Sequence, residues 1–445
     1  MFAQDVSGTW HGVLKVPSQD LPIVFHISNL NGDYITIMDS PAQGAKDLPT
    51  DKTIFKNKEL EITMDKLMIV FKGSLQNNNI NGTFTQAGMA FPLKLTRGDY
   101  KFKSKPQEPS KPYPYILEEV TFKNQNAGNI KLSGTLTIPN NVKNPPVAVL
   151  ISGSGAQNRN EEILGHKPFL VLADYLTKKG IAVLRYDDRG FADSEGDFAK
   201  ATTFDFASDV TAAVSYLKSR GNVVDINKIG LIGHSEGGMI APFIASENKN
   251  IAFIVLLAGP GISGDKVLLS QSRKALELAG VPENEIEISE KYSGLIYKTI
   301  AHYKGEESDK EINRLLHEMK NASSGILKAQ LTEDSIKKQI KFLTSPWMQE
   351  FIKFNPDIYL SKVKCPVLAI NGEKDTQVLA EINLSGIENS LKKSGNKDIT
   401  IQKLKDLNHL FQTSKTGSFN EYAKNEETFS PIALHIISDW ILKRF

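Results

Sequence analysis

The sequence predicts an α/β fold: a doubly wound, mostly parallel sheet with a helical cap insertion, preceded by a small antiparallel β-domain. Three observations support this prediction. Short alternating patterns fill residues 6–98, a proline-rich stretch follows, and continuous apolar runs then alternate with helical patterns. At 445 residues the chain also exceeds what one hydrophobic core usually serves, so two domains are expected.

Residues 1–102 are assigned to the antiparallel β-domain, because their apolar residues recur with the period of two that half-buried strands show. Strands are expected at residues 12–16, 21–27, 34–38 and 67–71. Tight turns are expected at Asn31-Gly32, Asn81-Gly82 and Arg97-Gly98-Asp99, since Gly and Asn tolerate the positive φ that hairpins need. Many short strands joined by hairpins indicate a barrel or half-barrel.

Residues 103–114 are predicted to be a linker. They contain four prolines among lysine, serine and glutamine, a composition that forms no core and favours extended backbone. The α/β domain therefore spans residues 115–445.

In this second domain, short apolar runs alternate with helices, which indicates parallel strands covered on both faces. Residues 118–122 and 130–138 are expected to pair as antiparallel strands. Parallel strands are expected at residues 147–151, 181–186, 229–232, 251–257 and 367–370, with crossover helices at 169–178 and 204–219. Sites in such sheets lie beyond the carboxyl ends of the strands.

Residues 262–350 interrupt this alternation. They show no convincing strand pattern but several charged amphipathic helices, including residues 266–279 and 312–319. Inserted between two strands of the sheet, they are predicted to form a cap above its carboxyl edge. A lid or a substrate-shaping wall is favoured over a purely decorative insert.

Composition excludes several classes of partner. A formal net charge of +2 and scattered basic residues predict neither nucleic acid nor an anionic membrane as partner. No apolar run approaches the roughly 20 residues of a membrane span. The single cysteine, Cys365, excludes an internal disulfide and a cysteine metal cluster.

The first four residues, Met1-Phe2-Ala3-Gln4, resemble the end of a bacterial secretory signal. A periplasmic or secreted location is therefore predicted, with a native cytoplasmic start as the alternative.

The strongest chemical signal is Gly233-His234-Ser235-Glu236-Gly237-Gly238, placed between a predicted strand and a predicted helix. A strand-to-helix turn of this G-x-S-x-G pattern forces its serine into a strained conformation at the strand end, and the flanking glycines prevent collisions. Ser235 is therefore the candidate nucleophile.

A serine hydroxyl needs a base, and the base needs an orienting acid. In this fold the chain order is serine, acid, histidine. Asp375 follows the strand at 367–370, and His409 follows the strand at 399–404, so both reach the edge where Ser235 lies. Glu373 is the alternative acid. The other histidines are weaker candidates for the base. His302 and His317 lie in the cap, and His435 lies in the C-terminal helix. His234 is interpreted as a structural part of the turn that carries Ser235.

Two backbone donors are expected for the oxyanion of the tetrahedral intermediate. One is the amide of Glu236, directly after the nucleophile. The other is assigned to Ser154 in Ser152-Gly153-Ser154-Gly155, where small residues let the backbone approach a substrate. A phosphate-binding turn is disfavoured there, because the third glycine and the acidic ribose partner are missing.

Two further features near this edge, one loop and one group of three residues, are interpreted in less detail. An Asp–Arg loop, Asp187-Asp188-Arg189-Gly190, is expected to hold loop against loop rather than to contact substrate. Glu161, Glu162 and His166 are candidates to line the site, although the sequence does not fix their direction.

These motifs resemble those of bacterial α/β-hydrolase carboxylesterases that carry a small N-terminal β-domain. The resemblance covers roughly residues 115–445. It implies hydrolysis of short acyl esters through an acyl-enzyme, without metal or cofactor, and it places the triad on Ser235, Asp375 and His409. One loop departs from the family's Arg-Gly-x-Gly-x-Ser, because Ala192 stands where the second glycine is usual.

The favoured function is a serine carboxylesterase acting on a small-molecule or glycan ester, with acetyl groups on sugars or polysaccharides as one option. An acyl-CoA thioesterase or a peptidase of the same fold is the second interpretation, since fold alone does not select the substrate. A catalytically inert carbohydrate-binding protein is a third, and the complete triad argues against it.

Overall fold

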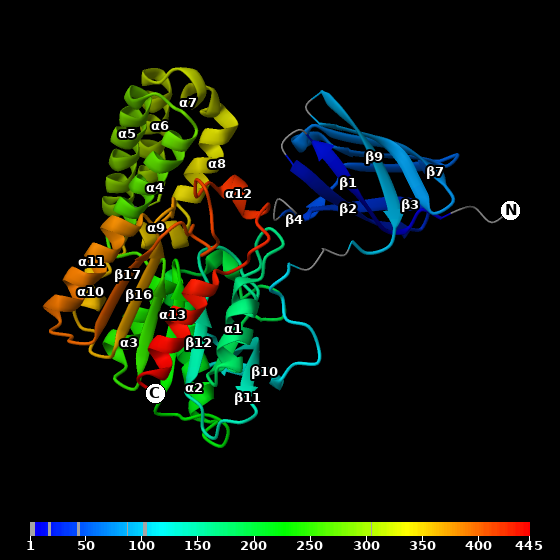
Figure 1. Ribbon diagram of the computed structural model, residues 1–445. Coiled ribbons are helices and arrows are strands. Elements are labelled where there is room, and N and C mark those ends of the chain that lie inside the picture. Colours follow the sequence, from blue (N-terminus) through cyan, green and yellow to red (C-terminus); the bar gives the residue numbers. More distant parts are fainter. Residues whose placement is uncertain (1–4, 17–18, 42–44, 87, 101–104, 304) are drawn as a thin grey trace. The chain divides into compact units, whose positions relative to one another are not determined.

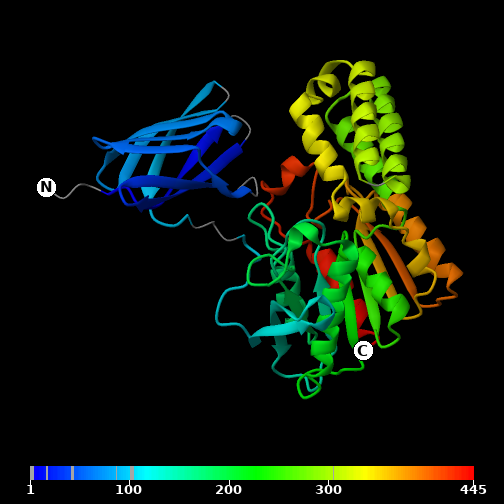
Figure 2. The same ribbon diagram turned by 180° about the vertical axis from the view of Figure 1, so that it is seen from behind.

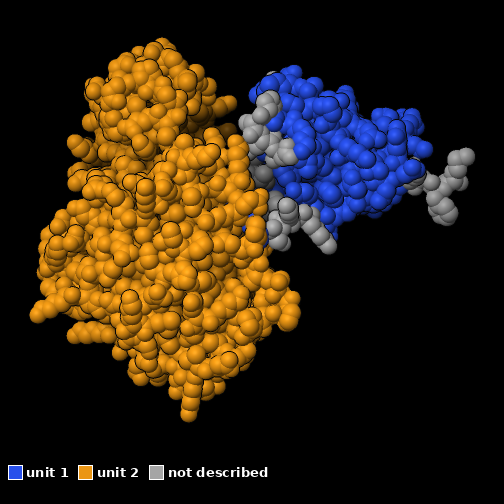
Figure 3. Space-filling view, in the orientation of Figure 1, with its two compact units in different colours: residues 1–105, 163–166 blue, residues 106–162, 167–445 orange. Residues whose placement is uncertain are grey.

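The computed structural model describes residues 5–16, 19–41, 45–86, 88–100, 105–303 and 305–445. It divides into two compact units (Figure 3). One comprises Met1–Lys105 with Ile163–His166, and the other comprises Pro106–Glu162 with Lys167–Phe445. Within the predicted linker at 103–114, residues 103–104 lie outside the described residues, and so do the four residues of the predicted signal remnant.

The described part of the first unit is one antiparallel sheet that curves into a half-barrel (Figure 1), in the order β4-β3-β2-β1-β9-β8-β7-β6-β5. Its strands are β1 Gly8–Val16, β2 Gln19–Leu30, β3 Asp33–Ser40, β4 Ala45–Pro49, β5 Lys52–Lys56, β6 Glu59–Met64, β7 Ile69–Gln76, β8 Asn79–Gln86 and β9 Met89–Arg97. The predicted half-barrel is confirmed. Large side chains such as Trp10, Phe25, Phe71 and Phe84 are buried and pack into one hydrophobic cluster within this unit.

Two details of this unit differ from the prediction. Asn81 and Gly82 lie inside β8, and the turn before β8 has Asn77 at a φ of 55°. Gly82 is needed for close strand approach, because a Cβ there would lie 2.3 Å from the carbonyl oxygen of Lys72. Strand β7 begins at Ile69, two residues later than predicted, because a short 3₁₀ helix occupies Asp65–Leu67.

The second unit is built on an eight-stranded sheet, in the order β10-β11-β13-β12-β14-β15-β16-β17. Its strands are β10 Tyr115–Asn124, β11 Ile130–Pro139, β12 Val147–Ile151, β13 Ala182–Tyr186, β14 Ile229–His234, β15 Phe253–Leu257, β16 Val367–Gly372 and β17 Ile399–Leu404. Strand β11 pairs antiparallel with both β10 and β13, and the other pairings are parallel. The predicted doubly wound, mostly parallel sheet is confirmed.

Helices cover both faces of this sheet (Figures 1 and 2). The apolar sides of α2 Thr203–Lys218, α3 Gly237–Glu247 and α11 Ala380–Lys393 pack into one core cluster. Those of α1 Pro168–Lys178 and α13 Pro431–Leu442 pack into the cluster on the other face. Strands buried on both sides are fully apolar, which explains their unbroken hydrophobic runs.

Between β15 and β16 the chain forms the predicted helical insert, which both ribbon views place at one end of the sheet (Figures 1 and 2). Its helices are α4 Gly264–Leu278, α5 Glu283–His302, α6 Glu306–Ala322, α7 Gly325–Gln330, α8 Glu333–Leu343 and α9 Pro346–Lys353, followed by α10 Asp357–Leu360. The insert has an apolar core of its own. A second cluster, which includes Met239, Val267 and Phe351, joins it to the sheet domain.

Within the described residues, no helix combines the length and the apolar character that crossing a bilayer would require.

Candidate active site

Ser235 occupies a tight turn between β14 and α3. Its φ of 51° lies in the left-handed region, which a non-glycine residue adopts only when its surroundings impose it. The neighbouring glycines explain how the turn closes. A Cβ on Gly233 would lie 2.0 Å from the carbonyl oxygen of Gly237, and a Cβ on Gly237 would lie 2.2 Å from that of Ile151. The sequence motif therefore forms the expected tight turn between strand and helix, called the elbow below.

Two backbone amides near Ser235 are free to donate hydrogen bonds to a negatively charged oxygen. Among the described residues, the amides of Glu236 and Ser154 donate to no acceptor, whereas the Gly153 amide donates to Glu161 Oε1 at 2.8 Å. The loop that carries Ser154 touches the elbow, because a Cβ on Gly153 would lie 3.2 Å from the Ser235 Cβ. The N-terminus of α3 adds the positive end of its dipole to this position.

Asp375 and His409 meet at the same edge of the sheet, on the loops that follow β16 and β17. His409 Nδ1 lies 2.8 Å from Asp375 Oδ2, and both side chains are buried. Asp375 Oδ1 accepts the amides of Gln377 at 2.8 Å and Val378 at 2.9 Å, which fixes the carboxylate. In a neutral imidazole that donates from Nδ1 to this carboxylate, Nε2 carries no proton and can accept one.

His409 also lies next to the elbow. Its ring centroid is 4.8 Å from that of His234, the residue directly before Ser235. The three residues of the predicted triad thus stand at the carboxyl ends of β14, β16 and β17, as the chain order required.

The alternative residues have other partners. Glu373 is exposed and accepts the amide of Asp406 at 3.2 Å. His302 and His317 bind carbonyls of their own cap helices, and His435 contacts the Tyr175 hydroxyl at 2.8 Å.

Glu236 contributes a buried side chain as well as its backbone amide, and no sequence pattern pointed to a role for this side chain. Its Oε1 accepts the Thr203 hydroxyl of α2 at 2.6 Å and the Trp347 indole N–H of α9 at 2.8 Å. Burial raises the pKa of this carboxyl, and the hydrogen bonds from Thr203, Trp347 and Ser154 oppose that rise. The residue after the candidate nucleophile therefore ties the elbow to α2 and to the cap.

The Asp–Arg loop has a structural role, as interpreted from the sequence, but it pairs with one neighbouring loop and with helix α2. Asp187 Oδ2 lies 2.5 Å from Arg159 Nη2, and Arg189 Nε lies 2.7 Å from Asp209 Oδ2. Ala192 keeps a φ of 48°, so this loop retains the left-handed conformation that suits the family's glycine.

Asp188, in the same loop, is buried and forms no ion pair with any basic residue in the described part of the chain. It accepts the Ser152 hydroxyl at 2.7 Å and the Gln157 amide at 2.9 Å. Burial is the main cause that raises its pKa to about 8, and the carboxylates of Glu236 and Glu161 add to the rise. The folded protein therefore binds this proton more tightly than the unfolded chain does.

A raised pKa means that stability is lost as the pH rises through it. We expect the unfolding temperature of the wild type to fall between about pH 4 and pH 8, and Asp188→Asn to reduce this fall. Asp193→Asn, on an exposed carboxylate of the same loop, is the control and should leave the pH dependence unchanged. Differential scanning fluorimetry across this range measures the effect, and equal slopes for Asp188→Asn and wild type would contradict it.

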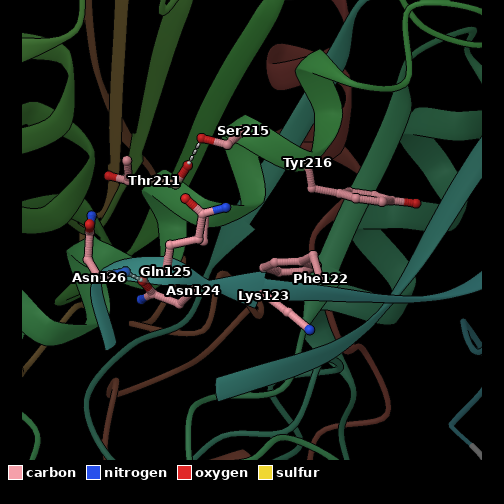
Figure 4. Close-up of a pocket in the computed structure, with 9 residues that line it drawn as sticks. Phe122, Lys123, Asn124, Gln125, Asn126, Thr211, Ser215 and Tyr216 are labelled. Carbon is pink, nitrogen blue, oxygen red and sulfur yellow. Dashed lines mark hydrogen bonds between the residues drawn. The ribbon is translucent and has the colours of Figure 1, made fainter. Parts of the chain in front are cut away.

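A separate hollow of about 370 Å³ lies between the end of β10 and α2 (Figure 4). Polar and aromatic side chains line it, including Asn124, Gln125, Thr211, Ser215 and Tyr216. None of the predicted site residues is part of this hollow.

The mixed sheet, the inserted helices and the serine elbow define a protein of the α/β-hydrolase fold. Residues 167–413, more than half of the chain, match the family described as "Serine aminopeptidase, S33", and the chain belongs to this family.

Two relatives and one solved structure illustrate the range of similarity. The chain is 31% identical over 180 residues to "Esterase EstD" of Thermotoga maritima, a match that covers 40% of this chain and 43% of the relative. It is 25% identical over 207 residues to an uncharacterized 31.7 kDa protein of Escherichia coli, covering 46% and 66%. The chain thus spans less than half of the length of the first relative and about two thirds of the second.

The esterase Pf2001 of Pyrococcus furiosus superposes with a TM-score of 0.46 at 18% identity, covering 78% of this chain and 99% of that structure.

Proposed function

We propose that this protein is a serine carboxylesterase that hydrolyses short acyl esters through an acyl-enzyme. The observation that carries the proposal is the buried Asp375–His409 hydrogen bond of 2.8 Å beside the strained Ser235 turn. A serine in this conformation, with a histidine held in one tautomer nearby, is the arrangement that activates a hydroxyl nucleophile.

In the proposed reaction, Ser235 Oγ attacks the ester carbonyl carbon while His409 Nε2 accepts its proton. Asp375 stabilises the resulting imidazolium, and the Glu236 and Ser154 amides donate to the oxyanion. Collapse of the tetrahedral intermediate breaks the carbon–oxygen bond, and His409 returns the proton to the leaving alcohol. Water then attacks the acyl-enzyme with His409 as base, releasing the acid and restoring Ser235.

Esters are proposed as substrates because EstD is called an esterase and because the carboxylesterase motifs are present. The family's description also names aminopeptidases, which must bind a free α-ammonium group. Glu161 and Glu236, two carboxylates near the elbow, are buried and already hydrogen-bonded, so neither offers an exposed carboxylate for that ammonium. Acetylated sugars as natural substrates and a periplasmic or secreted location stay predictions.

A chain-length series of p-nitrophenyl esters, from acetate to decanoate, tests this proposal. We expect fast turnover that is confined to the short chains. Parallel assays with acetyl-CoA and an aminoacyl p-nitroanilide test the thioesterase and peptidase alternatives. Turnover of either one, with no ester hydrolysed at any length, would overturn the carboxylesterase proposal.

A further inference from the structure

Glu161 and His234 form a buried contact behind the candidate nucleophile that the proposed mechanism does not use. His234 Nδ1 lies 2.8 Å from Glu161 Oε1, and both side chains are almost completely buried. The two residues are 73 positions apart in the chain. Glu161 has a φ of 51°, so its backbone is held in the left-handed region, a kind of strain that collects at functional sites.

This contact connects three loops around Ser235. Glu161 Oε1 also accepts the amide of Gly153, which directly precedes Ser154 in the oxyanion loop, at 2.8 Å. On its other side, His234 Nε2 lies 3.0 Å from the carbonyl oxygen of His409. One carboxylate oxygen and one imidazole thus join the oxyanion loop, the elbow and the loop that carries the proposed base.

The geometry also defines the charge of the imidazole. Both ring nitrogens of His234 face oxygens that can accept a hydrogen bond, one from a carboxylate and one from a peptide carbonyl. A neutral imidazole carries a single N–H and would leave one of these contacts without a proton. Burial alone opposes the charged form, but Glu161, the His409 carbonyl and the nearby Asp375 outweigh it and raise the pKa of His234.

We propose that Glu161 and His234 act as a carboxylate–imidazolium pair that positions the Ser154 amide and His409 around Ser235. This inference rests on the proposed function, since it assigns the pair to the same reaction. Neither residue touches the reacting atoms in this role. Glu161 holds the Ser154 loop through the Gly153 amide, and His234 holds the His409 loop through the His409 carbonyl. The Ser154 amide and the His409 side chain are therefore kept in fixed positions around Ser235.

A buried ion pair is a costly way to stabilise a fold, because both charges lose their hydration. A buried ion pair between the Ser154 loop and the His409 loop is better explained by its effect on their positions, because it fixes where the Ser154 amide and the His409 side chain lie. Displacing a catalytic group by about 1 Å can cost roughly 100-fold in rate, which sets the size of the expected effect.

The substitution Glu161→Gln tests whether the negative charge of Glu161 matters beyond its hydrogen bonds. The glutamine carbonyl can still accept the Gly153 amide and one imidazole N–H, but it provides no negative charge for His234. We expect kcat for p-nitrophenyl acetate to fall by about 10- to 100-fold while KM stays within about twofold. Binding of phenylboronic acid, which forms a tetrahedral adduct with the serine, should weaken by a similar factor. Glu195→Gln, on an exposed carboxylate that accepts the backbone amide of Lys131 at 2.9 Å, is the matched control and should behave as wild type.

His234→Gln and the double variant Glu161→Gln/His234→Gln complete a double-mutant cycle. If the two residues act as one unit, the double variant loses little more than the more damaging single variant, whereas independent effects would multiply. Thermal unfolding of each variant shows whether folded protein is being compared. Wild-type kcat in Glu161→Gln, a change confined to KM, or a loss of rate that only follows the loss of folded protein would each overturn the pair's role.

A fluorophosphonate probe distinguishes failure of this inference from failure of the proposed function. If the wild type hydrolyses no ester but Ser235 is labelled, slower labelling of Glu161→Gln still supports the pair, and equal labelling overturns it. If Ser235 of the wild type is not labelled at all, the proposed function itself is wrong.

Discussion

Ser235→Ala is expected to lower the kcat for p-nitrophenyl acetate by roughly 10⁶-fold. The substitution removes the hydroxyl that forms the acyl-enzyme and leaves His409 without a proton to accept. Only one hydroxyl is removed and the backbone of the turn is kept, so the substitution should leave the unfolding temperature within about 2 °C. Steady-state kinetics together with thermal unfolding measure both quantities.

Ser215→Ala is a suitable control for this variant. Ser215 lies on α2 at the hollow of Figure 4, and its hydroxyl donates to the Thr211 carbonyl at 2.9 Å. It should keep wild-type turnover. If Ser235→Ala kept that turnover too, the assignment of the nucleophile would be wrong.

Asp375→Asn should lower kcat by about 10⁴-fold. Asp375 Oδ1 accepts the Gln377 and Val378 amides, so an asparagine would place its carbonyl oxygen there and turn its NH₂ group towards His409. Nδ1 would then have to accept, and the proton would move to Nε2. In that tautomer His409 cannot take the proton of Ser235.

Glu373→Gln is the matched comparison, because this exposed carboxylate lies two positions before Asp375 and contacts the Asp406 amide. It should retain most of the wild-type kcat. The two variants are compared under identical conditions over a range of pH. If kcat fell severely in Glu373→Gln and only mildly in Asp375→Asn, Glu373 and not Asp375 would be the acid of the triad.

The sheet and the elbow could be predicted because local sequence specifies them. Buried parallel strands need unbroken apolar runs, and the crowded turn at Ser235 needs Gly233 and Gly237. Chain order then selected Asp375 and His409, because each follows a strand that ends at the same edge of the sheet. The turn predicted at Asn81-Gly82 was wrong for a similarly local reason. Gly82 is needed there because two strands approach closely, not because the backbone adopts a positive φ.

The contacts that support the site could not be predicted in this way. Glu161 reaches His234 across 73 positions, and Glu236 reaches Trp347 across 111. Glu161 lies on a loop without periodicity, so nothing in the sequence fixes its direction, and Trp347 lies in a cap helix whose packing depends on the folded sheet. Pairings of this kind follow from tertiary structure alone.

The central claim is that Ser235 becomes acylated, and trapping the intermediate tests it most directly. The wild type is mixed with excess p-nitrophenyl acetate, quenched in acid within milliseconds, digested and examined by mass spectrometry. We predict one acetyl group on the peptide that contains Ser235, formed at the rate of the p-nitrophenol burst and absent from Ser235→Ala. An acetyl group formed at that rate on any other residue, or a full burst without acetylated Ser235, would contradict the account.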